Sequence, residues 1–176
     1  MYKFLLRRRI KRIINHLNRK KSYNNIEEIR SVLILFDTKD FEDVSLFIQK
    51  LARMEKRIKA YAFKDKRNAA GNYDISCTIL TDKDGNNKSL NQIVTGLSNE
   101  TFDLVVDFSL MENLLLLYIL AAIDSPLKAG LYRHAFSVHD IVIVSDPGLG
   151  RNVKELGNQL FHFLTIMSSG TASGGE

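Results

Sequence analysis

The chain has 176 residues, of which 45% are hydrophobic and 26% are charged, as in an ordinary globular protein with one core. Its single cysteine, Cys77, excludes an internal disulfide and fits a reducing compartment, so we expect a cytoplasmic protein. The longest apolar run, residues 114–123, is shorter than the roughly 18 residues that a membrane span needs. It therefore predicts a core helix.

The net charge of +5 comes from one segment. Residues 1–21 hold nine of the 25 lysines and arginines and no acidic residue, which leaves 16 basic and 20 acidic residues in 22–176. An anionic partner should therefore meet the N-terminal segment first.

Residues 1–21 are predicted to form a basic amphipathic helix, because apolar residues from Tyr2 to Leu17 recur at helical spacing. Three interpretations are open: a helix packed on its own domain, a helix on an anionic membrane surface, or a nucleic-acid contact. The membrane interpretation would make the protein membrane-peripheral, and Phe4 and Leu5 favour it by widening the apolar face. The cations available for an anionic surface are Arg7, Arg8, Arg9, Lys11 and Arg12.

A polar joint at 22–30 precedes a domain at 31–167, and a Gly/Ser-rich tail at 168–176 is predicted to be disordered. Strands are predicted at 31–36, 57–63, 75–80, 102–109, 127–132 and 140–144. Helices are predicted from Asp40, from Ser89, over about 112–124 and over about 152–167, with Asp40 and Ser89 as N-caps.

Continuous apolar strands that alternate with helices are typical of a mostly parallel sheet covered on both faces. We therefore expect one α/β domain with a Rossmann-like, three-layer fold. The strand order stays open, and strand 75–80 could be antiparallel or lie at an edge, since no obvious helix precedes it.

Polar side chains follow three predicted strands: Asp37, Asp107 with Ser109, and Asp146. Parallel sheets place ligands at the carboxyl ends of their strands, so these four residues are the predicted ligand-binding site. Clustered carboxylates could hold Mg²⁺, but aspartate is also a common turn former, and we predict no metal. His134 and His139, five apart, lack the spacing of metal ligands.

A glycine-rich phosphate loop is absent after the first strand, where the sequence reads Asp37-Thr38-Lys39-Asp40. The nearest substitute is Gly148, Gly150 and Arg151, between a strand and a helix, where backbone N–H groups could bind a phosphate. A tight strand-to-helix turn explains these glycines more simply, and we expect no cofactor.

The segments 102–109, 118–126, 127–132 and 139–144 together resemble an uncharacterised family of short bacterial α/β proteins. The same order is distantly similar to the N-terminal half of heptosyltransferase-like GT-B glycosyltransferases, in which a glycine-containing strand corresponds to the strand with Gly130. The chain departs from those enzymes at Thr38-Lys39-Asp40, where they carry a glycine. It also has no counterpart of their donor-binding half. The resemblance implies a Rossmann-like fold and disfavours independent catalysis.

We therefore expect a non-catalytic binding or adaptor domain whose basic helix docks on an anionic membrane surface or a partner protein. The alternative is a small-molecule, nucleotide or nucleotide-sugar binding protein, or an enzyme, that uses the edge near Asp37, Asp107 and Asp146. Nucleic acid is a weaker candidate partner, and a homo-oligomer is a further one.

Overall fold

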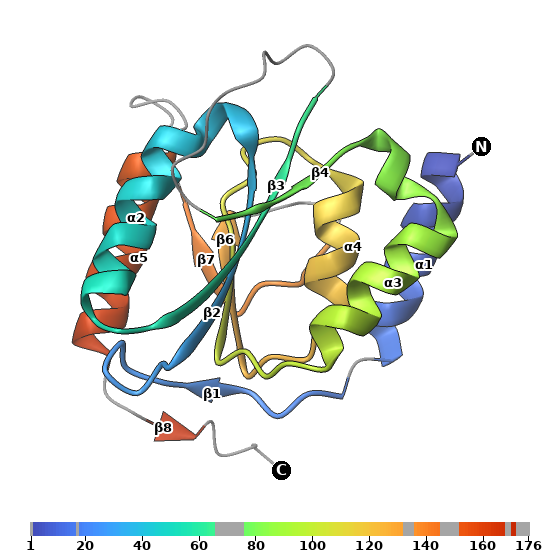
Figure 1. Cartoon of the computed structure of the whole chain (residues 1–176). Coiled ribbons are helices and arrows are strands. Elements are labelled where there is room, and N and C mark those ends of the chain that lie inside the picture. The colour runs from blue at the N-terminus through green and yellow to red at the C-terminus, as the bar shows by residue number, and fades with distance from the viewer. Residues whose placement is uncertain are drawn as a thin grey trace.

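The computed structural model describes residues 2–16, 18–65, 76–131, 136–144, 152–167 and 170–171. A parallel six-stranded sheet stands between two layers of helices (Figure 1). The predicted α/β, Rossmann-like three-layer fold is therefore confirmed.

The sheet has the order β4-β3-β2-β5-β6-β7, and all its pairings are parallel. Its centre is made by β2 and β5, because their sequences SVLILFD and LVVD are apolar enough to be covered on both faces. The strands are β2 (Ser31–Asp37), β3 (Arg57–Phe63), β4 (Thr78–Leu80), β5 (Leu104–Asp107), β6 (Leu127–Leu131) and β7 (Ile141–Ile143).

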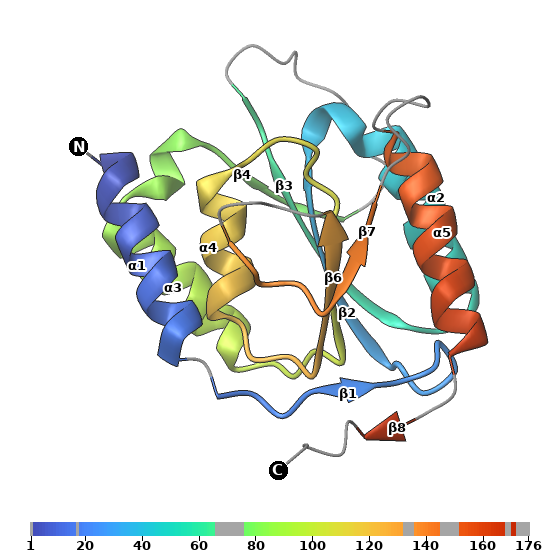
Figure 2. The ribbon, with the colours of Figure 1, turned by 180° about the vertical axis from the view of Figure 1, so that it is seen from behind.

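Helices α2 (Phe41–Arg53) and α5 (Val153–Ile166) cover one face of the sheet, as Figures 1 and 2 show. The other face carries α1 (Tyr2–His16), α3 (Asn87–Ser98) and α4 (Leu114–Ala122). Two short 3₁₀ helices, η1 (Thr38–Asp40) and η2 (Asp82–Gly85), follow β2 and β4. Each face has its own apolar core, and β2 contributes alternate side chains to both.

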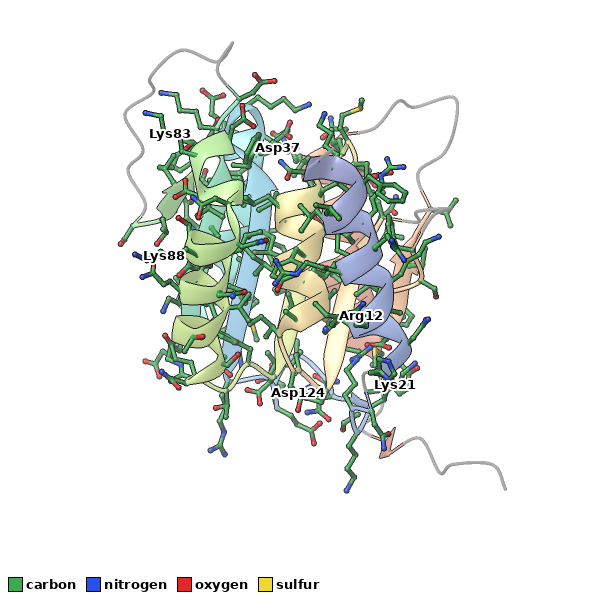
Figure 3. All side chains as sticks on the ribbon, turned by 90° about the vertical axis from the view of Figure 1, so that its right-hand side faces the viewer. Arg12, Lys21, Asp37, Lys83, Lys88 and Asp124 are labelled. Carbon is green, nitrogen blue, oxygen red and sulfur yellow. The ribbon has the colours of Figure 1, made fainter. Side chains whose placement is uncertain are left out.

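Helix α4, with the sequence LLLLYILAA, has no polar side, and the fold explains why. It lies on the sheet between α1 and α3, so that residues 115–121 are all buried (Figure 3). A helix with apolar residues on every side is stable in water only when other elements cover all of its sides. Leu6 and Ile10 of α1 are buried in the same core, and this supports the interpretation that the basic helix packs on its own domain.

The structure corrects several boundaries. The N-terminal helix ends at His16 rather than at 21, and Asn86, not Ser89, is the N-cap of α3 because its side chain accepts from the Ser89 N–H. Asp40 occupies the N-cap position of α2 without a capping hydrogen bond. The strand predicted at 75–80 is the parallel edge strand β4.

A second, two-stranded sheet lies below the main sheet, near the C-terminus (Figure 1). β1 (Ser22–Tyr23), inside the predicted joint, pairs antiparallel with β8 (Gly170–Thr171). The segment predicted to be a disordered tail, 168–176, includes β8 at Gly170 and Thr171. The remainder of that tail lies outside the described residues.

Candidate functional site

The sheet reverses its direction of growth between β2 and β5. From β2 the chain builds outward through β3 to β4, and it then crosses back to add β5, β6 and β7 on the other side. Open α/β sheets bind ligands at such a switch point, outside the carboxyl ends of the strands. At this switch point β2 ends at Asp37 and β5 ends at Asp107.

Asp37 and Asp107 lie near one another, since each is the last residue of its strand and Asp107 pairs with Leu35. Burial raises the pKa of Asp37 to about 6, and the carboxylates of Asp40 and Asp107 add to the rise. Lys39 and a hydrogen bond to Asn113 act in the opposite direction. Asp37 therefore titrates close to neutral pH.

Asp107 is buried below Asp37, with only 1% of its side chain exposed. Its Oδ1 accepts hydrogen bonds from the Ser109 backbone N–H, at 3.0 Å, and from the Ser109 hydroxyl. His139 Nε2 lies 3.6 Å from Asp107 Oδ2. The serine donates to the aspartate and not to the histidine, so the three residues do not form a nucleophile–base relay.

His139 reaches Asp107 across Gly130 of β6. A Cβ at position 130 would lie 2.5 Å from His139 Nε2 and 2.9 Å from the Asp107 backbone oxygen. Glycine at this strand position lets the imidazole lie directly on the sheet.

Three buried polar atoms at this edge lack a hydrogen-bond partner among the described residues: Thr38 Oγ1, Asp40 Oδ2 and His139 Nε2. They are all the side-chain atoms of this kind that the described part of the chain contains, and buried polar atoms are normally paired. Burial is the main cause that raises the pKa of Asp40 as well. The unpaired hydrogen-bonding capacity thus gathers at the switch point.

Within the described ranges, no group of three or more His, Cys, Asp and Glu side chains is arranged to hold a metal ion. Carboxyl groups, a hydroxyl and an imidazole can instead accept and donate hydrogen bonds to an organic ligand.

The structure thus brings together three of the four predicted ligand-binding residues: Asp37, Asp107 and Ser109. The fourth, Asp146, lies outside the described residues, as do the predicted phosphate-binding residues Gly148, Gly150 and Arg151.

The basic residues of the N-terminal segment divide into two groups. Arg7 pairs with Glu112 at 2.8 Å, and Arg9 donates to Tyr118 Oη at 2.8 Å while also bonding Asn87 and Asn91. Arg8, Lys11 and Arg12 are exposed on the outer side of α1. Of the five predicted surface cations, two are thus engaged within the fold.

Two further cations beyond α1 form ion pairs with one buried carboxylate. Arg19 lies 2.6 Å from Asp140, whose side chain is 1% exposed, and Lys21 lies 3.2 Å from the same carboxylate. Asp140 also accepts from the Lys128 backbone N–H. The segment after α1 is thereby fixed to β6 and to the start of β7.

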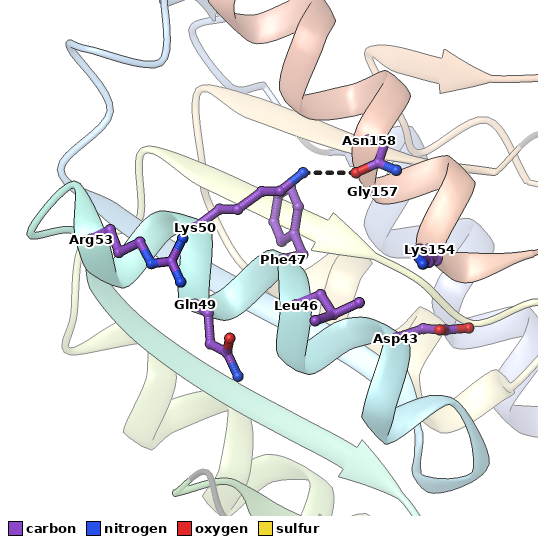
Figure 4. Close-up of a pocket in the computed structure, with 9 residues that line it drawn as sticks. All are labelled: Asp43, Leu46, Phe47, Gln49, Lys50, Arg53, Lys154, Gly157 and Asn158. Atoms are coloured by element: carbon purple, nitrogen blue, oxygen red, sulfur yellow. Dashed lines mark hydrogen bonds between the residues drawn. The ribbon is translucent and has the colours of Figure 1, made fainter.

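A shallow groove of 190 Å³ lies on the opposite layer, between α2 and α5 (Figure 4). Phe47 and Gly157 form part of its wall, and Lys50 donates to Asn158 across it at 2.7 Å. It lies on the outside of the helix layer, away from the strand ends, and shares no residue with the switch point.

Sequence reasoning missed His139, Asn113 and Lys128. His139 comes from the irregular connection before β7, and its only sequence signal is the glycine inside β6, which indicates a close approach. Asn113 follows the N-cap pattern, since its side chain accepts from the backbone of Leu115 and Leu116. Lys128 lies in an apolar strand, where nothing in the sequence indicates that its ammonium binds helix carbonyls.

None of the described helices is long and apolar enough to cross a membrane. No curated protein and no solved structure matches the chain. Residues 3–167 match a family of unknown function, DUF6913. The match spans both helix layers and the whole sheet, and the chain therefore belongs to this family.

Proposed function

We propose that the protein is a non-catalytic docking domain that binds an anionic membrane surface through the outer face of α1. The observation that carries this proposal is the exposure of Phe4 and Leu5, 62% and 52%, beside the exposed cations Lys3, Arg8, Lys11 and Arg12, which form no ion pair with any described acidic residue. Peripheral helices that bind membranes combine these two features.

The outer face of α1 is distinct from its packed face. Leu6 and Ile10 point into the core, whereas Phe4 and Leu5 lie on the first turn and face away from it. Arg8 lies over the Phe4 ring, with its guanidinium carbon 5.7 Å from the ring centroid. An aromatic ring covered by a cation on a basic helix suits the boundary between lipid headgroups and acyl chains.

Charge supports a lipid partner at the same place. Lys3, Arg8, Lys11 and Arg12 are all exposed on α1, while residues 22–176 carry an excess of four acidic residues. A Lys or Arg near an anionic bilayer contributes about 1 kcal/mol, and an apolar side chain the size of Phe or Leu adds about 1.5–3 kcal/mol when fully buried. Together these groups support reversible attachment.

Vesicle flotation of the full chain tests the proposal. The chain should float with vesicles of phosphatidylserine and phosphatidylcholine and not with phosphatidylcholine alone. The double substitution Lys11→Gln/Arg12→Gln should weaken binding by about 2 kcal/mol, roughly thirtyfold. Phe4→Ser/Leu5→Ser should weaken it on the anionic vesicles while the net charge stays unchanged.

Lys83→Gln/Lys88→Gln is the matched control, because it removes the same charge from exposed positions on and next to α3 (Figure 3). It should bind as the unchanged chain does. An equal loss in this control, or salt-dependent binding of single-stranded RNA without vesicle binding, would contradict a lipid surface. Equal melting temperatures of the variants establish that the fold is retained.

The bacterial origin and the likeness to a glycosyltransferase half stay predictions. The switch-point carboxylates disfavour a phosphate-containing donor at the edge of β2, since Asp37 and Asp40 would repel it. This supports the binding function over sugar transfer.

A further inference from the structure

A second site, separate from the outer face of α1, is marked by the polar residues where β2 and β5 end. We infer that this switch-point site, formed by Asp37, Thr38, Asp40, Asp107 and His139, binds a small organic ligand that carries a primary ammonium group. The inference is independent of membrane docking.

The first argument is the gathering of unpaired buried atoms. Thr38 is 6% exposed and the His139 side chain 2%, yet Thr38 Oγ1 and His139 Nε2 have no hydrogen-bond partner among the described residues. Asp40 Oδ2 is a third buried atom without such a partner. A buried polar atom without a partner destabilises the fold, so three of them near the ends of neighbouring strands point to a ligand that pairs them.

The second argument is connectivity. Thr38 and Asp40 follow Asp37 directly, as the first and last residues of η1. Asp37 is close enough to Asp107 for their charges to interact, and Asp107 is 3.6 Å from His139. The carboxyl groups of Asp40, Asp37 and Asp107 therefore form a connected series from the partly exposed strand end down to the buried histidine.

The third argument selects the chemical class. Among the described residues, the carboxyl groups of Asp37 and Asp40 share one basic neighbour, Lys39, so this part of the site favours a cation over a phosphate. Asp40 Oδ2 needs a donor, and a primary ammonium offers three N–H donors from one compact charge. A cation would also replace the proton that burial and like charges retain on Asp37.

The pH dependence follows from the groups around Asp37. They are Lys39, Asp40, Asp107 and the side chain of Asn113. With a pKa of about 6, Asp37 is roughly nine-tenths protonated at pH 5 and mostly ionised at pH 7. An alkylammonium keeps its charge throughout this range, so its affinity should fall about tenfold from pH 7 to pH 5.

Calorimetric titration of the full chain with 1,4-diaminobutane tests the inference, with 1,4-butanediol as an uncharged probe of matched shape. We expect the diamine to bind and the diol not to bind at constant ionic strength. Asp40→Asn should weaken diamine binding at least tenfold, and Asp37→Asn should reduce the difference in affinity between pH 5 and pH 7.

Asp124→Asn is the control variant, because Asp124 is exposed at the opposite end of the molecule (Figure 3). It should retain the affinity within twofold. Equal binding of diol and diamine, binding of inorganic phosphate in preference to either, an equal loss in Asp124→Asn, or no diamine binding at 20 mM would each overturn the inference. Thermal melting of each variant should be measured as well, and unchanged melting temperatures would establish that Asp37→Asn and Asp40→Asn leave the fold intact.

Discussion

Single atoms decide which side chains the strand ends tolerate, and Gly130 is the clearest case. Its added Cβ would collide with His139 Nε2 and with the Asp107 backbone oxygen, and the backbone oxygen cannot move aside as a flexible side chain could. Gly130→Ala should therefore lower the free energy of unfolding by about 1–3 kcal/mol, measured by urea denaturation. Gly96→Ala is the control, since nothing lies within 4 Å of its added Cβ, and it should raise stability by up to about 1 kcal/mol. Equal effects at the two positions would contradict this.

A buried lysine gives the second residue-scale prediction. Lys128 is fully buried and its Nζ donates to the Leu120 carbonyl at 2.6 Å, at the end of α4. Burial, with the nearby Arg19 charge, lowers the Lys128 pKa to about 7 from 10.5. Between these values the unfolded chain holds a proton that the folded chain does not, so this group makes stability rise with pH from about 7 to 10.5.

Urea denaturation at a series of pH values checks this dependence. Lys128→Met should remove a slope of up to about 1.4 kcal/mol per pH unit between pH 7 and pH 10. A variant whose stability curve runs parallel to that of the unchanged chain would show that Lys128 keeps its proton in the fold.

At the scale of elements, α1 has a packed and an outward side, and they should differ in energy. Ile10 is fully buried against the core that includes α4, whereas Leu5, on the same helix, is 52% exposed. Ile10→Ala should cost about 2–5 kcal/mol of unfolding free energy, and Leu5→Ala less than about 1 kcal/mol. Urea denaturation measures both. If both substitutions lower the unfolding free energy by a similarly small amount, α1 is not part of the cooperative fold.

The amphipathic pattern of α1 could be recognised in the sequence, but the partners of its charged side chains could not be predicted. Arg7 and Arg9 meet partners from residues 87–118, and Arg19 meets Asp140. Such pairs depend on which helices become neighbours on the sheet. A pattern in one segment cannot specify this.

Across the whole molecule, the three-layer arrangement could be predicted from the sequence, because long apolar strands and periodic helices are compatible with few folds. The candidate ligand site could be predicted only in part. Asp37, Asp107 and Ser109 were predicted because the strand-end rule needs only the strand boundaries and a parallel sheet. His139 was not predicted because it enters from a connection without regular structure. The unpaired state of Thr38 and Asp40 depends on packing that the sequence does not encode locally.

The pairing of α1 with α4 has a consequence for how the chain acquires its structure during synthesis. Helix α1 leaves the ribosome before the segments it contacts, since Arg7 bonds a residue 105 positions later and Arg19 bonds one 121 positions later. At about 5–20 residues per second, translation of that interval takes on the order of 5–20 s. Throughout that time Leu6 and Ile10 have no core to enter. The nascent helix is then a basic amphipathic segment open to chaperones and to any anionic surface near the ribosome, before the domain that later covers its apolar side exists.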